Sequence, residues 1–134
     1  MKRMLKVFVV GLVLAMAVTF SVSAATAQVE LTKRMYYVSG SHLSFSAAQA
    51  QYRGTIYPDS TCECKIYLFA KTANGNREIS SRVLTPGSSV FSSPWYGPYN
   101  ASDYNATAWY PYAQPYNSGS SGTGGHCTVT AAGY

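Results

Sequence analysis

The stretch that most constrains the fold of this chain runs from Thr61 to Lys71 and reads TCECKIYLFAK. Every second residue on one side is small or apolar: Cys62, Cys64, Ile66, Leu68 and Ala70. The other side is mixed: Thr61, Glu63, Lys65, Tyr67, Phe69 and Lys71. Because successive side chains of a β-strand point to opposite faces, this alternation predicts a half-buried strand with Cys62 and Cys64 facing the core.

The dipeptide Asn74-Gly75 follows this strand and favours a β-hairpin closed by a type I′ turn. That register places four pairs opposite each other: Lys71 with Glu78, Ala70 with Ile79, Tyr67 with Arg82, and Ile66 with Val83. One pair is ionic, one is cation–π and two are apolar, each worth about 0.2–1 kcal/mol. We therefore expect residues 61–84 to form a central hairpin.

The first 27 residues have the three parts of a secretory signal peptide. A basic start with Lys2, Arg3 and Lys6 precedes an uncharged run over residues 7–20, and small residues then offer cleavage after Ala24 or Ala27. The run is short for a membrane span, which needs about 20 apolar residues. We expect a signal-peptide helix over 1–27, an exported domain over 28–134, and membrane contact only during export.

The charge of the exported part excludes one class of partner. The whole chain has a formal net charge of +5, but three of its ten basic residues lie in the signal peptide, whereas all five acidic residues lie beyond it. The remainder is close to neutral, so the basic excess does not indicate nucleic-acid binding.

The rest of the sequence predicts more short strands separated by turns. Alternating stretches occur at 28–38, 88–93, 103–112 and 126–131. Residues 43–57 read as one bent strand with a bulge at Gly54, the alternative being a helical turn around Ala47–Gln51. In 103–112, Tyr110 and Tyr112 are expected on the buried side, which places Trp109 outside. About seven strands at this spacing predict a single all-β domain, an antiparallel β-sandwich or small barrel.

Three cysteines, Cys62, Cys64 and Cys127, suit a disulfide in an exported protein, with one thiol left over. The predicted bond joins Cys127 to Cys64, or else to Cys62. The alternative is three buried thiols. A metal site that adds His126 is disfavoured, because neighbouring strand residues point to opposite faces.

No catalytic residues are expected. His42 and His126 are the only histidines, and the serines lack the G-x-S-x-G context of a hydrolase nucleophile. The acidic residues are scattered along the chain, with no motif for a paired-carboxylate site. We expect no enzyme activity and no cofactor or metal.

Eight aromatic residues between positions 95 and 116, interspersed with prolines, are the densest unusual feature. Rigid aromatic rings supply binding surface at low entropic cost, and they also fill cores that are poor in aliphatic residues. The candidate binding residues are Trp95, Tyr96, Tyr99 and Trp109.

These patterns favour a secreted, non-catalytic domain that binds an extracellular glycan, a cell wall or a protein partner. The alternative is a structural or toxin-like (bacteriocin-like) protein that acts by self-association or at a cell envelope. A small hydrolase built on His42 or His126 is the third hypothesis.

Overall fold

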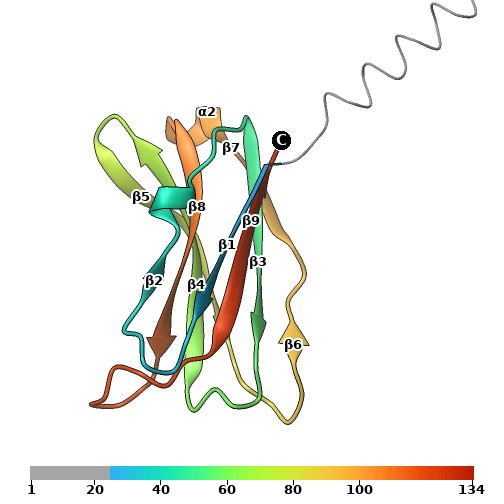
Figure 1. The fold of residues 1–134 in the computed structure, drawn as a ribbon. Helices are drawn as coiled ribbons and strands as arrows, with labels where there is room; N and C mark the ends of the chain where they lie inside the picture. Colours follow the sequence, from blue (N-terminus) through green and yellow to red (C-terminus); the bar gives the residue numbers. More distant parts are fainter. Residues whose placement is uncertain (1–24) are drawn as a thin grey trace, which may run out of the picture.

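The computed structural model describes residues 25–134 as two antiparallel sheets packed face to face (Figure 1). The first sheet has the order β1-β9-β3-β6, with β7 also paired to β3, and the second has the order β2-β8-β4-β5. The predicted all-β sandwich is confirmed. The predicted signal-peptide helix lies outside the described residues.

The strands of the first sheet are β1 (Ala25–Leu31), β3 (Gln49–Ile56), β6 (Phe91–Ser92), β7 (Tyr96–Asn100) and β9 (Cys127–Gly133). Those of the second are β2 (Val38–Ser39), β4 (Glu63–Thr72), β5 (Gly75–Leu84) and β8 (Ala108–Tyr116). Two short helical turns join them, η1 (Ser41–Leu43) and α2 (Ala101–Tyr104). In the described part of the chain, no helix is long and apolar enough to cross a membrane.

Strand β4 forms the middle of the second sheet, between β8 and β5. Its inward side chains, Cys64, Ile66, Leu68 and Ala70, are fully buried, as the alternation predicts. Across the sandwich they meet the inward side chains of the first sheet, among them Leu31, Tyr52, Ile56, Cys127 and Val129. The sequence pattern at 61–71 therefore locates the core strand correctly.

The predicted hairpin is present, but its register is wrong. Thr72 pairs with Gly75, so the turn is centred on Ala73 and Asn74. Of the turn residues, only Gly75 has a positive φ, at 113°. The predicted type I′ turn needs positive φ at both Asn74 and Gly75, and Asn74 does not have it.

This turn changes every predicted pair. Lys71 lies opposite Asn76 instead of Glu78, and the register shifts again between Leu68 and Phe69. On the turn side of that shift Ala70 meets Arg77 instead of Ile79. Beyond the shift, Tyr67 meets Ser81 and Ile66 meets Arg82. The register error does not affect the predicted inward and outward faces of β4, because these depend on the alternation within β4 and not on its pairing partner.

Two other segments differ from their predicted boundaries. The strand expected over 28–38 ends at Leu31, and Tyr37 is exposed. The bent strand expected from Leu43 begins only at Gln49, after a 3₁₀ turn at Ser41–Leu43. The alternative helical turn at Ala47–Gln51 is also absent, because this segment enters β3 and pairs with β9 and β7.

Gly54 marks close sheet-to-sheet packing. A Cβ atom at this position would lie 2.8 Å from the Cδ1 atoms of both Ile66 and Leu84, and 3.2 Å from the carbonyl oxygen of Thr128. The glycine therefore lets β3 approach the hairpin of the opposite sheet.

We predict that Gly54→Ala lowers the free energy of unfolding by about 1–3 kcal/mol, because the added methyl group overpacks the core. The matched control is Gly87→Ala, since nothing lies within 4 Å of a Cβ at that position. The control should change stability by no more than about 0.5 kcal/mol. Urea unfolding of both variants measures this, and equal stabilities would contradict the packing argument.

Candidate functional site

The structure buries Trp109, which the sequence placed on the surface. Its side chain is 0% exposed, and its indole Nε1 donates a hydrogen bond of 3.0 Å to the carbonyl oxygen of Ala47. It faces inward next to Ala70, its partner on β4. Trp109 is thus a core residue, and its predicted role in an exposed binding surface is wrong.

Trp109 was predicted to be exposed because the alternation of inward and outward residues in β8 was assigned the wrong way round. Tyr104 belongs to the short helix α2, and Asn105 has a positive φ of 55°, so the alternation does not continue back from β8. Within β8, Trp109, Pro111, Ala113 and Pro115 oppose the inward residues of β4. Both faces of β8 are rich in apolar residues, so its sequence alone does not specify which face is buried.

The other three predicted binding residues do not form one exposed surface. Trp95 is 37% exposed, and the guanidinium of Arg53 lies 4.6 Å from its ring centroid. Tyr96 is half-buried between the ring of Tyr52, at 5.4 Å, and the guanidinium of Arg82, at 4.9 Å. Trp95 precedes β7 and Tyr96 is its first residue, and the two rings contact different side chains of β3, Arg53 and Tyr52.

Tyr99 helps to close the side of the sandwich. Its hydroxyl donates a 2.9 Å hydrogen bond to the Ser80 hydroxyl on β5, and the Tyr52 hydroxyl lies 2.7 Å from the same oxygen. Burial raises the pKa of Tyr52 to about 12, so this phenol stays protonated. These contacts join β7 and β3 of one sheet to β5 of the other, a structural role for Tyr99.

A different set of rings gathers on the outer face of the second sheet. We call it the outer aromatic cluster, and it consists of Tyr37, Tyr67, Phe69, Tyr110 and Tyr112. The register explains it, because Phe69 lies opposite Tyr110 and Tyr67 lies opposite Tyr112. Directly opposed strand residues bring their side chains within contact distance.

The rings of the outer aromatic cluster have ordered geometry. Phe69 stacks on Tyr110 at a centroid distance of 5.4 Å, and Tyr37 stacks on Tyr112 at 5.7 Å with an interplanar angle of 10°. Tyr67 and Tyr110 are almost fully buried by their neighbours, whereas Tyr37 is 58% exposed. Burial raises the pKa values of Tyr67, Tyr110 and Tyr112.

Polar side chains border this cluster along β4 and β8. The Gln114 amide donates a 2.8 Å hydrogen bond to the Tyr67 hydroxyl. The ammonium group of Lys65 lies 5.5 Å from the Tyr67 ring centroid and 5.6 Å from that of Tyr116. The Glu63 carboxylate accepts hydrogen bonds from Thr85 and Asn117. Two rings of this face could be recognised from the sequence, because Tyr67 and Phe69 lie in the middle of the outward side of residues 61–71.

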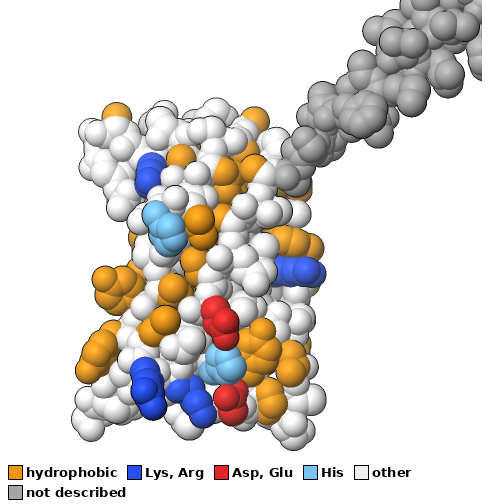
Figure 2. Space-filling view, in the orientation of Figure 1, with side chains coloured by type: hydrophobic (Ala, Val, Ile, Leu, Met, Phe, Trp, Pro, Cys, Tyr) orange, Lys and Arg blue, Asp and Glu red, His pale blue; other side chains and the backbone are white. Residues whose placement is uncertain are grey.

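A charged cluster lies at the first sheet, where sequence reasoning found no site. The His126 Nδ1 lies 2.6 Å from an Asp59 carboxylate oxygen, and its Nε2 lies 3.0 Å from a Glu30 carboxylate oxygen. Lys33 forms a 3.6 Å ion pair with Asp59, and the Tyr57 ring lies against the imidazole. On the face shown in Figure 2, one histidine lies between two acidic side chains.

The carboxylates of the charged cluster favour the protonated form of His126. The hydrogen bonds to Asp59 and then Glu30 raise the pKa of His126, while the bond to His126 lowers the pKa of Asp59. Both ring nitrogens are occupied by carboxylates, so neither is free to accept a proton from a serine hydroxyl. Among residues 25–134, no group of histidine, cysteine and acidic side chains is arranged to hold a metal ion.

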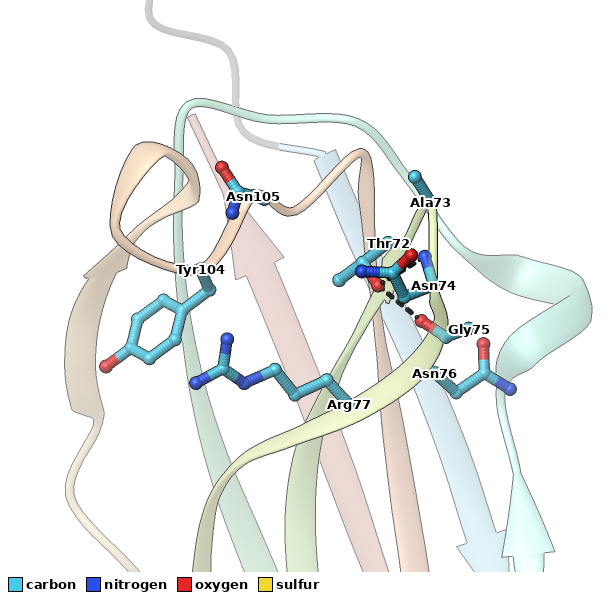
Figure 3. Close-up of a pocket in the computed structure, with 8 residues that line it drawn as sticks. All are labelled: Thr72, Ala73, Asn74, Gly75, Asn76, Arg77, Tyr104 and Asn105. Atoms are coloured by element: carbon cyan, nitrogen blue, oxygen red, sulfur yellow. Dashed lines mark hydrogen bonds between the residues drawn. The ribbon is translucent and has the colours of Figure 1, made fainter.

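A polar pocket of about 350 Å³ lies beyond the β4–β5 turn (Figure 3). Its lining includes Asn74, Asn76, Arg77, Tyr104 and Asn105. The Arg77 guanidinium extends toward the Tyr104 ring, at 5.3 Å from its centroid. The amides and the guanidinium can donate hydrogen bonds to a polar ligand, but only one ring borders this pocket.

The predicted disulfide is not formed in the structure, where Cys62, Cys64 and Cys127 are free thiols. Cys64 and Cys127 both belong to the buried core cluster. The Cys127 thiol is the main cause that lowers the pKa of the Cys64 thiol. The Cys64 thiol and burial raise the pKa of Cys127.

No protein-family model and no curated protein matches this sequence. Among solved structures, the Yersinia pseudotuberculosis-derived mitogen aligns with a TM-score of 0.45 and 11% identity, over 84% of this chain and 86% of that chain. PirA aligns with a TM-score of 0.41 and 8% identity, over 80% and 91% of the two chains.

A family 29 carbohydrate-binding module complexed with cellulohexaose aligns with a TM-score of 0.41 and 11% identity, over 79% of this chain and 68% of that chain. These similarities concern the fold alone and do not identify a function.

We predict that His126→Gln destabilises the protein more at about pH 6 than at about pH 9. The raised pKa of His126 means that its stabilisation is fully present below the unfolded-state value of about 6.5, and is lost as pH rises through the folded-state value. The lowered pKa of Asp59 sets the acid limit, since its contribution is lost as pH falls below about 4.

Urea unfolding at the two pH values measures this difference. His42→Gln is the control, because the carboxylate contacts to histidine in the described chain all involve His126. A destabilisation by His126→Gln that is equal at both pH values would show that the charge of the imidazole is unimportant.

Proposed function

We propose that this protein is a secreted, non-catalytic domain that binds an extracellular glycan on its outer aromatic cluster. The observation that carries the proposal is the composition of this sheet face. The outer face of an antiparallel sandwich is ordinarily polar, because it faces water. Here its centre carries Tyr67, Phe69, Tyr110 and Tyr112 in mutual contact.

The geometry suits sugar stacking at one end of the cluster. Tyr37 is held nearly parallel to Tyr112 and remains 58% exposed, so its orientation is fixed before a ligand arrives. Aromatic rings bind the apolar faces of sugar rings, and a preoriented ring loses little conformational entropy on binding.

The polar border supplies the other half of sugar recognition. Lys65 and Gln114 lie next to the rings on β4 and β8, and Glu63 lies two residues further along β4 on the same face. Together they offer an ammonium donor, an amide and a carboxylate acceptor. A glycan presents hydroxyl groups beside its apolar ring faces, so a surface with both kinds of group fits it better than a purely apolar partner.

The competing hypothesis of self-association has less support. Strand β5 lies at an edge of the second sheet and is the longest edge strand of the two sheets, so it offers a second copy the most backbone for pairing. This edge carries Arg77, Glu78 and Arg82, all exposed. Charged side chains on an edge strand oppose pairing with a second chain. A protein partner remains the alternative ligand for the same aromatic surface.

Secretion is part of the proposal and rests on the signal-peptide pattern of the sequence. Strand β1 adds a preference between the two cleavage positions. Ala25, Thr26 and Ala27 pair with Gly133, Ala132 and Ala131 of β9. Cleavage after Ala24 keeps this whole strand, whereas cleavage after Ala27 removes three of its seven residues.

We predict that Tyr37→Ala weakens glycan binding by about threefold to tenfold, because one stacked ring contributes about 0.5–1.5 kcal/mol. Affinity electrophoresis in gels containing soluble cellulose, chitin or mannan derivatives, with pull-down on insoluble peptidoglycan, identifies the ligand and ranks the variants. Stability should change little, because Tyr37 is exposed and precedes β2.

Two controls locate the binding surface. Tyr134→Ala removes an exposed tyrosine that lies outside the cluster and should leave binding unchanged. Arg77→Ala alters the polar pocket and should also have no effect. If Arg77→Ala abolishes binding and Tyr37→Ala does not, the site is the pocket. If no glycan retains the unmodified protein, the glycan proposal is wrong.

We also predict that the exported protein begins at Ala25. N-terminal sequencing or intact-mass analysis of protein collected from the medium of an expressing culture determines this directly. A start at Gln28 would contradict the argument from β1, and a start at Met1 would contradict secretion through a cleaved signal peptide.

A further inference from the structure

Two thiols meet in the core where the sheets face each other. Cys64 lies on β4 of the second sheet and Cys127 on β9 of the first, and both are 0% exposed. They belong to one core cluster, and the Ser60 hydroxyl that lies beside the Cys64 sulfur also accepts a 2.9 Å hydrogen bond from the backbone N–H of His126, the residue next to Cys127. The space around them is filled, because the Ser60 hydroxyl lies 3.7 Å from the Cys64 sulfur, and a Cβ at Gly125 would lie 3.0 Å from it.

We propose that Cys64 and Cys127 are a disulfide-forming pair, which becomes an inter-sheet bond when the chain folds in the presence of a disulfide donor. The pairing follows from their position, since a disulfide links side chains that face each other within contact distance. This inference is independent of glycan binding, and its test does not require export.

Cys62 is the thiol left over. It precedes β4 at the end of the sandwich, and its sulfur lies 3.9 Å from the carbonyl oxygen of Thr123. Gly124, in the same loop, is close enough that a Cβ there would lie 3.9 Å from this sulfur. Cys62 therefore packs against the loop before β9 rather than in the centre of the core.

The chemistry is thiol–disulfide exchange. The Cys64 thiolate attacks a disulfide donor, forms a mixed disulfide and releases one donor thiolate. Cys127 then loses its proton, attacks the Cys64 sulfur and releases the second donor thiolate. The protein gives up two protons and two electrons, and the donor disulfide is reduced to two thiols.

Burial determines when this exchange takes place. A donor cannot reach either sulfur once both sheets are packed, because each side chain is fully buried. Cys127 is the first residue of β9, the last strand of the chain, and β9 inserts between β1 and β3. We therefore place the reaction before β9 completes the first sheet.

The experiment refolds the urea-unfolded protein, residues 25–134, with and without glutathione disulfide, followed by thiol counting in denaturant. Refolding with the donor should leave one free thiol, and non-reducing peptide mapping should identify a Cys64–Cys127 linkage. The oxidised form should melt roughly 10 °C or more above the reduced form, because the bond closes a long loop in the unfolded chain.

Three variants make the result specific. Cys62→Ala should still form the bond and retain no free thiol, whereas Cys64→Ala and Cys127→Ala should lose the donor-dependent rise in melting temperature. Three free thiols after refolding with the donor would overturn the proposal. A linkage that contains Cys62 would overturn it too, as would a Cys64–Cys127 bond that leaves the melting temperature unchanged.

Discussion

The pairing of β4 with β8 is the interaction on which the other features of this structure depend. It puts small and apolar residues of both strands on the inward side, where they meet the first sheet across the core. Burying this surface supplies the main driving force for folding. Because strand side chains alternate, the same register also fixes what appears on the outward side.

The outer aromatic cluster is the second consequence of that register. If β8 were shifted by one residue, Trp109 would point outward and Tyr110 inward, and the outer face would lose its aligned rings. The buried indole avoids an unsatisfied polar atom through its hydrogen bond to Ala47. Core packing and the proposed binding surface are therefore two sides of one strand pairing.

The charged cluster and the thiol pair are formed by residues near the chain ends and in the loops. Glu30 comes from β1, Asp59 from the turn before β4, and His126 from the residue before β9. Cys127, the next residue, points to the opposite side and into the core. The start of β9 thus contributes to a charged surface cluster and to a buried thiol pair at once.

Local alternation in the sequence was sufficient to predict the all-β class, the orientation of β4 and the burial of Cys64. The sequence misplaced Trp109, because both faces of β8 are rich in apolar residues and alternation alone then gives no preference. It also missed the Asn74-Gly75 register, which depends on backbone angles that the dipeptide permits in more than one turn.

Only the tertiary structure brought together Glu30, Asp59 and His126, or Tyr37 and Tyr112, since these residues are distant in the chain and their contact depends on strand order.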